Sequence, residues 1–144
     1  MNSRLVNVVK SGLIATAAMT MLMLVAPMMG MPKMPIGNML ANFMQLPAAI
    51  GWFMHFMIGV VLAGAYIFFF RSVLSGNALI KGMLFSLIPF FMAQLVVMPM
   101  MGAGLFSSHT PAPLLMVMGS LMGHLVFGVV LGWAAKDSME TVAA

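Results

Sequence analysis

Residues 55–62 are HFMIGVVL and residues 124–131 are HLVFGVVL. The same motif, a histidine followed by three residues and then by Gly-Val-Val-Leu, therefore occurs twice. Each copy lies in a long apolar run without a charged residue, 48–70 and 112–135. A helix that rises ~1.5 Å per residue needs ~20 apolar residues to cross the hydrocarbon core of a bilayer. Both runs therefore predict transmembrane helices.

Two further charge-free runs, Gly12–Met29 and Gly82–Met101, have a similar length. The chain of 144 residues is 63% hydrophobic and 6% charged, whereas about 25% of a soluble globular sequence is charged. Barrel strands would alternate in polarity, and these runs do not. We predict an all-α, multi-pass protein of four transmembrane helices, with the lipid bilayer as its surroundings. A signal peptide starting at Arg4 and Lys10 is the alternative for the first run, but the run is long and no small-x-small cleavage site follows it.

The basic residues indicate topology rather than nucleic-acid binding, although the net charge is +4 and the pI is near 10.2. Those on one predicted side are Arg4, Lys10, Arg71, Lys81 and Lys136, and Lys33 alone lies on the other. The positive-inside rule then places both termini and the middle loop in the cytoplasm of a bacterial inner membrane. The chain has no cysteine, which excludes disulfides and thiol redox chemistry.

The order of motifs indicates a duplicated hairpin. Pro-Met-Met-Gly ends the first run at 27–30 and the third at 99–102, and each copy precedes a histidine-containing run. Lys10 and Lys81 open the two copies. We predict one domain of two hairpin repeats, about 10–71 and about 81–136, related by a pseudo-two-fold axis along the membrane normal.

The first external loop predicts a short amphipathic helix over Ile36–Gln45 that lies at the outer interface and ends before Pro47. Its apolar stripe is Ile36, Met39, Leu40, Phe43 and Met44. In the third run, Pro89 should kink the helix and free a backbone carbonyl, which Ser86 is expected to satisfy in part.

Both histidines lie on helix faces made of small residues, because residues four apart share one side of a helix. The two faces are Gly51, His55, Gly59 and Ala63 on the second run, and Ser120, His124, Gly128 and Gly132 on the fourth. In lipid, stripes of small residues mark close approach between helices, since packing replaces the missing hydrophobic drive. We expect the two imidazoles to face inward and the small residues to be helix-packing positions.

An ionisable residue inside a membrane is a functional hypothesis by default, and several interpretations of His55 and His124 stay open. In the first, each imidazole hydrogen-bonds a neighbouring helix; the available partners are Thr16, Thr20, Ser86 and Gln94. In the second, both are axial ligands of haem b. Haem would hold the two backbones on the order of 12 Å apart. Small-residue packing brings helices closer than ~8–10 Å, so one pair of faces cannot do both.

In the third interpretation the ligand is copper(I), which accepts thioether and imidazole ligands. The chain has 21 methionines, and the Pro-Met-Met-Gly motifs set Met28, Met29, Met100 and Met101 at the outer mouth. Methionine is also a flexible apolar filler, and here it occurs along every run. Quinone, lipid and other ligands remain open as well.

The acidic residues argue against catalysis and proton coupling. Asp137 and Glu140 are the only acids, and both belong to the predicted cytoplasmic tail. No carboxylate is present on the external side to orient His109 for a Ser-His pair, and none lies in the membrane for proton-coupled export. No phosphate-binding motif occurs.

The segments VMPMMGAGLF (97–106) and MGHLVFGVVLG (122–132) resemble a family of small bacterial four-helix membrane proteins of unknown function. The similarity runs from about residue 10 to 135 and implies the same topology, but it implies no activity. We expect a non-catalytic accessory or scaffold protein that packs against itself, as a homo-oligomer, or against a larger membrane complex. A haem b or copper(I) carrier using His55 and His124, and an oligomeric small-molecule transporter, are the alternatives.

Overall fold

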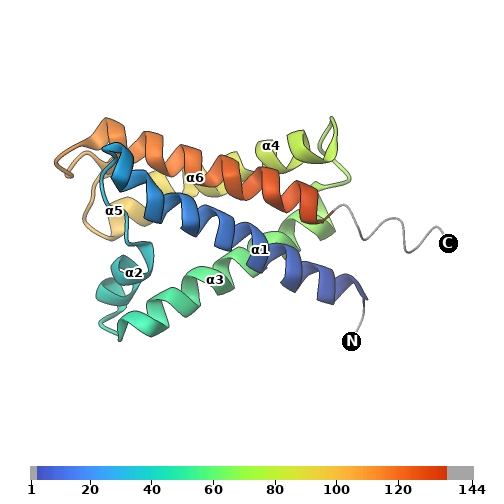
Figure 1. Ribbon diagram of the computed structural model, residues 1–144, viewed down its shortest axis with the longest axis horizontal. Coiled ribbons are helices and arrows are strands. Elements are labelled where there is room, and N and C mark those ends of the chain that lie inside the picture. The colour runs from blue at the N-terminus through green and yellow to red at the C-terminus, as the bar shows by residue number, and fades with distance from the viewer. Residues whose placement is uncertain (1–2, 136–144) are drawn as a thin grey trace.

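The computed structural model describes residues 3–135, and every regular element in that range is helical (Figure 1). The elements are α1 (Ser3–Val25), α2 (Ile36–Met44), α3 (Ala48–Ala65), α4 (Ala78–Met92), α5 (Met98–Met100) and α6 (Pro113–Ala134). A 3₁₀ turn, Ala26–Met29, extends α1, and π-helical turns extend α3 over Tyr66–Phe70 and α4 over Ala93–Val97; a 3₁₀ turn over Leu105–Ser107 precedes α6. The predicted all-α class is confirmed. The predicted end of the second repeat at Lys136, together with Asp137 and Glu140, lies outside the described residues.

Four helices of the described chain are long and apolar enough to cross a membrane, as predicted. They are Ser3–Met29, Ala48–Phe70, Ala78–Met100 and Pro113–Ala134. The first begins at Ser3 rather than at Gly12, since arginine and lysine are good helix formers and their long side chains keep the charge away from an apolar layer. The protein is thus a helical membrane protein by the length and composition of its helices.

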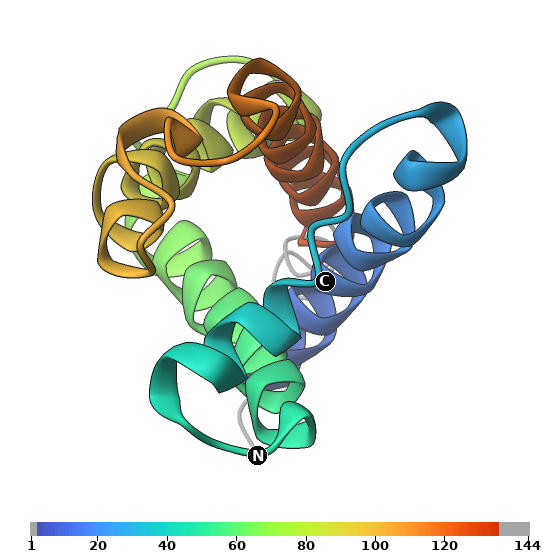
Figure 2. The same cartoon turned by 90° about the vertical axis from the view of Figure 1, so that its left-hand side faces the viewer.

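The four long helices form a ring in the order α3, α1, α6, α4 (Figure 2). α1 packs against both α3 and α6, α6 packs against α4, and α2 packs on α3. The remaining side is open in comparison, because α3 and α4 meet mainly where the π-helical turn Tyr66–Phe70 touches α4. A two-fold axis between the hairpins would make the α1–α6 and α3–α4 contacts equivalent. The structure departs from that symmetry on this side.

The end of the bundle that carries α2 and α5 is called the outer end here, and the opposite end, where α1 begins and α6 finishes, the inner end (Figure 1). The packed core fills the inner half. Its buried residues are Val8, Ala15, Ala63, Tyr66, Phe85, Phe127, Leu131 and Ala135. Aromatic rings pack at a tilt at its centre, with the Phe85 centroid 5.3 Å from that of Tyr66 and 5.2 Å from that of Phe70. This aromatic layer closes the bundle below the outer half.

Basic side chains tie the loops together at the inner end. Arg71 Nη1 donates a hydrogen bond to the carbonyl oxygen of Ala135, 2.6 Å away, at the C-terminus of α6. Lys81 Nζ donates to the carbonyl oxygen of Arg71 at 3.0 Å. A cation beside a helix C-terminus is favourable because the helix dipole leaves partial negative charge there. The bond from Arg71 therefore fixes the α3–α4 loop against the end of α6.

The predicted short helix is confirmed as α2, and Gln45 ends it in a left-handed conformation (φ 56°). Its position differs from a helix held only at the interface, because α2 lies on α3. A Cβ atom at Gly37 would collide with the Trp52 ring, and one at Gly51 would collide with the backbone of α2. Glycine at these two positions lets the short helix seat closely on the long one.

The expected role of Ser86 beside Pro89 is wrong. Pro89 frees the carbonyl four residues back, at Phe85. The Ser86 hydroxyl donates instead to the carbonyl oxygen of Met83 at 2.7 Å, because a serine in a helix reaches a carbonyl three or four residues earlier.

Candidate ligand-binding cavity

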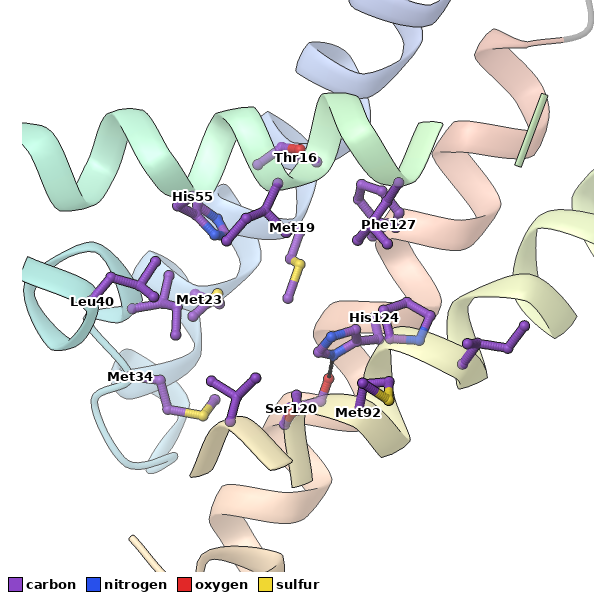
Figure 3. A pocket seen from close by; sticks show the side chains of 18 of the residues that line it. Thr16, Met19, Met23, Met34, Leu40, His55, Met92, Ser120, His124 and Phe127 are labelled. Atoms are coloured by element: carbon purple, nitrogen blue, oxygen red, sulfur yellow. Dashed lines mark hydrogen bonds between the residues drawn. The ribbon is translucent and has the colours of Figure 1, made fainter. Parts of the chain in front are cut away.

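A cavity of about 400 Å³ occupies the outer half of the ring, above the aromatic layer (Figure 3). All four long helices and α2 contribute to its wall. Phe85 and Phe127 lie at its boundary with the core, since both line the cavity and both are buried. The volume lies in the lower part of the ~300–1,000 Å³ range that is common for small-molecule sites.

His55 lines this cavity from α3. Its Nε2 atom lies 3.2 Å from the hydroxyl oxygen of Thr20 on α1. Two rings hold the imidazole edge-on, with centroids at 6.0 Å for Trp52 and 5.7 Å for Phe56. The histidine of the first hairpin is therefore held by the neighbouring helix of the same hairpin.

His124 lines the same cavity from α6. Its Nδ1 atom lies 2.7 Å from the carbonyl oxygen of Ser120, one turn back on its own helix (Figure 3). The ring of Phe90 on α4 packs edge-on at a centroid distance of 5.8 Å. Both imidazoles thus border the same cavity. His55 is positioned by a side chain of a neighbouring helix, and His124 by a backbone carbonyl of its own helix.

The small residues beside the histidines meet the first helix of their own hairpin rather than each other. In the first hairpin, a Cβ atom at Gly59 would meet the side chain of Thr16 on α1. In the second, a Cβ atom at Gly128 would meet Gly82 and Ser86 on α4. The other predicted packing positions follow: Gly51 faces α2, Ala63 is fully buried near Gly12, Gly132 abuts Ala78, and Ser120 borders the cavity.

This arrangement leaves room between the histidine-bearing helices. The closest glycine contacts beside the histidines lie within each hairpin, and α6 packs on α1 and α4, so α3 and α6 are not drawn together along their small faces. The geometric conflict between haem and close packing of these two helices therefore does not arise. The partner positions, Gly12 and Thr16 on α1 and Gly82 and Ser86 on α4, share one spacing, which is the sequence signal for this pairing.

One family model matches almost the entire sequence. The family model of DUF6789, described as a family of unknown function, matches residues 2–141. The chain belongs to this family. No curated protein and no solved structure shows a significant match.

The methionines predicted as copper ligands in this DUF6789 member lie at the surface of the outer end. Met28 is 86% exposed and Met29 80% exposed. Met100 and Met101 border a second pocket beside Met39 of α2. Neither pair borders the central cavity.

A different set of methionines surrounds the two histidines: Met19, Met23, Met34, Met39, Met92 and Met98. The spacing of Met19 and Met23, four apart on α1, is the part of this set that the sequence signals. The lining has no acidic or basic residue besides the histidines, and no cluster of three His, Cys, Asp or Glu occurs within residues 3–135. The polar groups that a ligand meets here are imidazole, hydroxyl and thioether.

The segment between α1 and α2 and the start of α2 cover the outer mouth. Met34 is buried, and a Cβ atom at Gly119 of α6 would meet its terminal methyl group. Ile36, Met39 and Leu40 of the α2 stripe line the cavity below. The apolar stripe of this helix, which was predicted to lie at the outer interface, thus faces the cavity over part of its length.

The loop before α6 lies apart from this site. Gln94, in the π-helical turn of α4, is buried and accepts a hydrogen bond from the Ser107 hydroxyl at 3.3 Å, while its Nε2 atom has no partner. His109 is exposed, with Nδ1 3.3 Å from the carbonyl oxygen of Gly102. Neither Gln94 nor His109 borders the central cavity.

Proposed function

We propose that this protein is a non-catalytic membrane protein that binds an uncharged lipophilic molecule in the central cavity. The observation that carries the proposal is a cavity walled by aliphatic, aromatic and thioether groups, into which two imidazoles project. A scaffold protein would not need such a space. The absence of acidic residues from the lining supports a binding role over proton-coupled transport or acid–base catalysis.

Haem b is a weaker ligand for this cavity. Its two propionates require basic or hydrogen-bond-donating partners, and no lysine or arginine lines the space. The Nε2 atom of His55 is also engaged by Thr20. Copper(I) is the second candidate because of the six thioethers around the histidines, which are ligands of the softness that copper(I) prefers.

The test is the content of the cavity after purification in a mild detergent. We expect organic extraction and mass spectrometry to find an uncharged lipophile at about one molecule per chain. Ser120→Phe, which places a bulky ring in the cavity wall, should lose it. Met118→Phe, two residues away on α6 at an exposed site outside the lining, should keep it.

Equal amounts of lipophile in both variants, or none in the wild type, would contradict the proposal. Stoichiometric copper by elemental analysis would favour the second candidate, and an intense Soret absorption band would favour haem. Both metal outcomes would overturn the lipophile.

We propose further that the inner end lies in the cytoplasm of a bacterial inner membrane. The bias of basic residues toward that end supports this orientation. Because the chain has no cysteine, single substitutions can report topology. Ser108→Cys should react with a membrane-impermeant maleimide added outside intact cells, and Ser75→Cys should react only after the membrane is opened; the reverse pattern would contradict the orientation.

A further inference from the structure

The hydrogen bond of His124 fixes the position of its ring proton. A backbone carbonyl only accepts hydrogen bonds, so Nδ1, at 2.7 Å from the Ser120 oxygen, carries the hydrogen. The neutral ring then has its lone pair on Nε2. Within the described residues Nε2 has no hydrogen-bond partner, and the ring borders the cavity. The second hairpin therefore offers the cavity an acceptor.

The opposite tautomer follows for His55. The Thr20 hydroxyl has one hydrogen, and it donates this hydrogen to the Thr16 carbonyl oxygen at 2.8 Å. Toward His55 it can only accept, so Nε2 of His55 carries the hydrogen and donates it across 3.2 Å. The lone pair of this ring lies on Nδ1. The imidazole of the first hairpin also leaves an acceptor rather than a donor.

The remaining polar groups of the lining are few. The Thr16 hydroxyl donates to the carbonyl oxygen of Gly12 at 2.7 Å, so its hydrogen is used. The Ser120 hydroxyl is the one side-chain donor in the described lining without a hydrogen-bond partner. A ligand that supplies hydrogen-bond donors finds two ring nitrogens, while a ligand that only accepts finds one hydroxyl. Anions and cations find no counter-charge.

From this count, and resting on the proposed function, we propose that the ligand is an alcohol- or phenol-headed lipophile whose hydroxyl donates to Nε2 of His124. The hydrocarbon part lies against the thioethers and the aromatic layer. It enters from the bilayer between α3 and α4, the side where helix packing is weakest. Exposed residues of both helices line the cavity on this side: Ile58, Ile88 and Met92.

The test compares 4-octylphenol, which has a hydroxyl donor, with its methyl ether, 4-octylanisole, in which a methyl group replaces the hydroxyl hydrogen. In lipid nanodiscs, we expect wild-type protein to bind the phenol about 5- to 10-fold more tightly, which corresponds to one buried hydrogen bond. His124→Phe keeps an aromatic side chain and removes the proposed acceptor, so it should lose most of the preference for the phenol. His109→Phe, outside the cavity, should retain the preference.

The outcomes separate this proposal from the proposed function. Equal binding of the two probes by wild-type protein would overturn the donor-headed ligand and leave a lipophile-binding cavity. Binding of neither would overturn both. Because His124→Phe can fail to fold, ¹⁵N NMR of histidine-labelled wild-type protein gives a second measurement: Nε2 of His124 should be unprotonated and should shift on addition of the phenol. A protonated Nε2 in the free protein would overturn the inference.

Discussion

The two hairpins use the same residue types for their helix contacts but make them with different tightness. In α4–α6, glycine meets glycine, and a Cβ atom at Gly128 would collide with the carbonyl oxygen of Gly82. In α1–α3, the Cβ atom of Gly59 would collide with a side chain, that of Thr16. At Gly128 the nearest atom is therefore backbone, whereas at Gly59 it is a hydroxyl-bearing side chain, although α1 also meets the backbone of α3 at Gly12. The contact at Gly59 therefore has more room to adjust than the contact at Gly128.

The greatest loss of stability should follow a substitution at Gly128. Gly128→Ala should destabilise the protein by about 3 kcal/mol or prevent folding, because the new methyl group meets backbone that cannot move aside. Thermal unfolding in detergent measures the loss. Gly64→Ala is the matched control on α3: its Cβ atom would find only Val8 Cγ1 at 3.6 Å, and alanine favours helix by up to ~1 kcal/mol. A Gly128→Ala protein as stable as the control would contradict the tight contact.

A smaller loss is expected at Gly59, and it should be recoverable. Gly59→Ala should cost about 1–2 kcal/mol, since the clash is with the Thr16 side chain. Thr16→Ala removes the hydroxyl and methyl group from that space, so the double variant should regain much of the loss. A double-mutant cycle from thermal unfolding isolates the coupling. Additive effects would show that Thr16 does not set the spacing of this hairpin.

The helices could be predicted from the sequence, but the side of each helix that faces the cavity could not. Charge-free runs predicted the four long helices, and the stripe from Ile36 predicted α2, because both signals depend on local composition and period. The ring order could not be predicted. In lipid the surroundings are as apolar as the interior, so hydropathy does not distinguish a cavity-facing methionine from a lipid-facing one. Met34 and Met28 look alike in sequence, yet one is buried and the other is exposed.

Part of the candidate site could be predicted from the sequence, because polar residues stand out in apolar helices. His55 and His124 stand out because polar residues are costly in lipid, and Thr20 was among the predicted partners of the histidines. The methionines of the cavity were not distinguished from those of the Pro-Met-Met-Gly motifs. The positions of Met34 and Met39 depend on how α2 seats on α3, where Gly37 meets Trp52 and Gly51 meets α2. Contacts of that kind leave only isolated glycines in the sequence.

The weakest loss of stability is expected at the hydrogen bond between Thr20 and His55. Thr20→Val keeps the side-chain volume and removes the acceptor of His55 Nε2–H. The stability loss should be below about 1 kcal/mol, since interhelical hydrogen bonds in membranes average ~0.6 kcal/mol. The tautomer should respond more clearly: ¹⁵N NMR should show His55 changing from one form to a mixture, while His124 stays unchanged. Ser120→Ala is the control, because His124 is bonded to the backbone carbonyl at that position and not to the hydroxyl. An unchanged His55, or a His124 that changes with it, would mean that the two imidazoles are not oriented by separate hairpins.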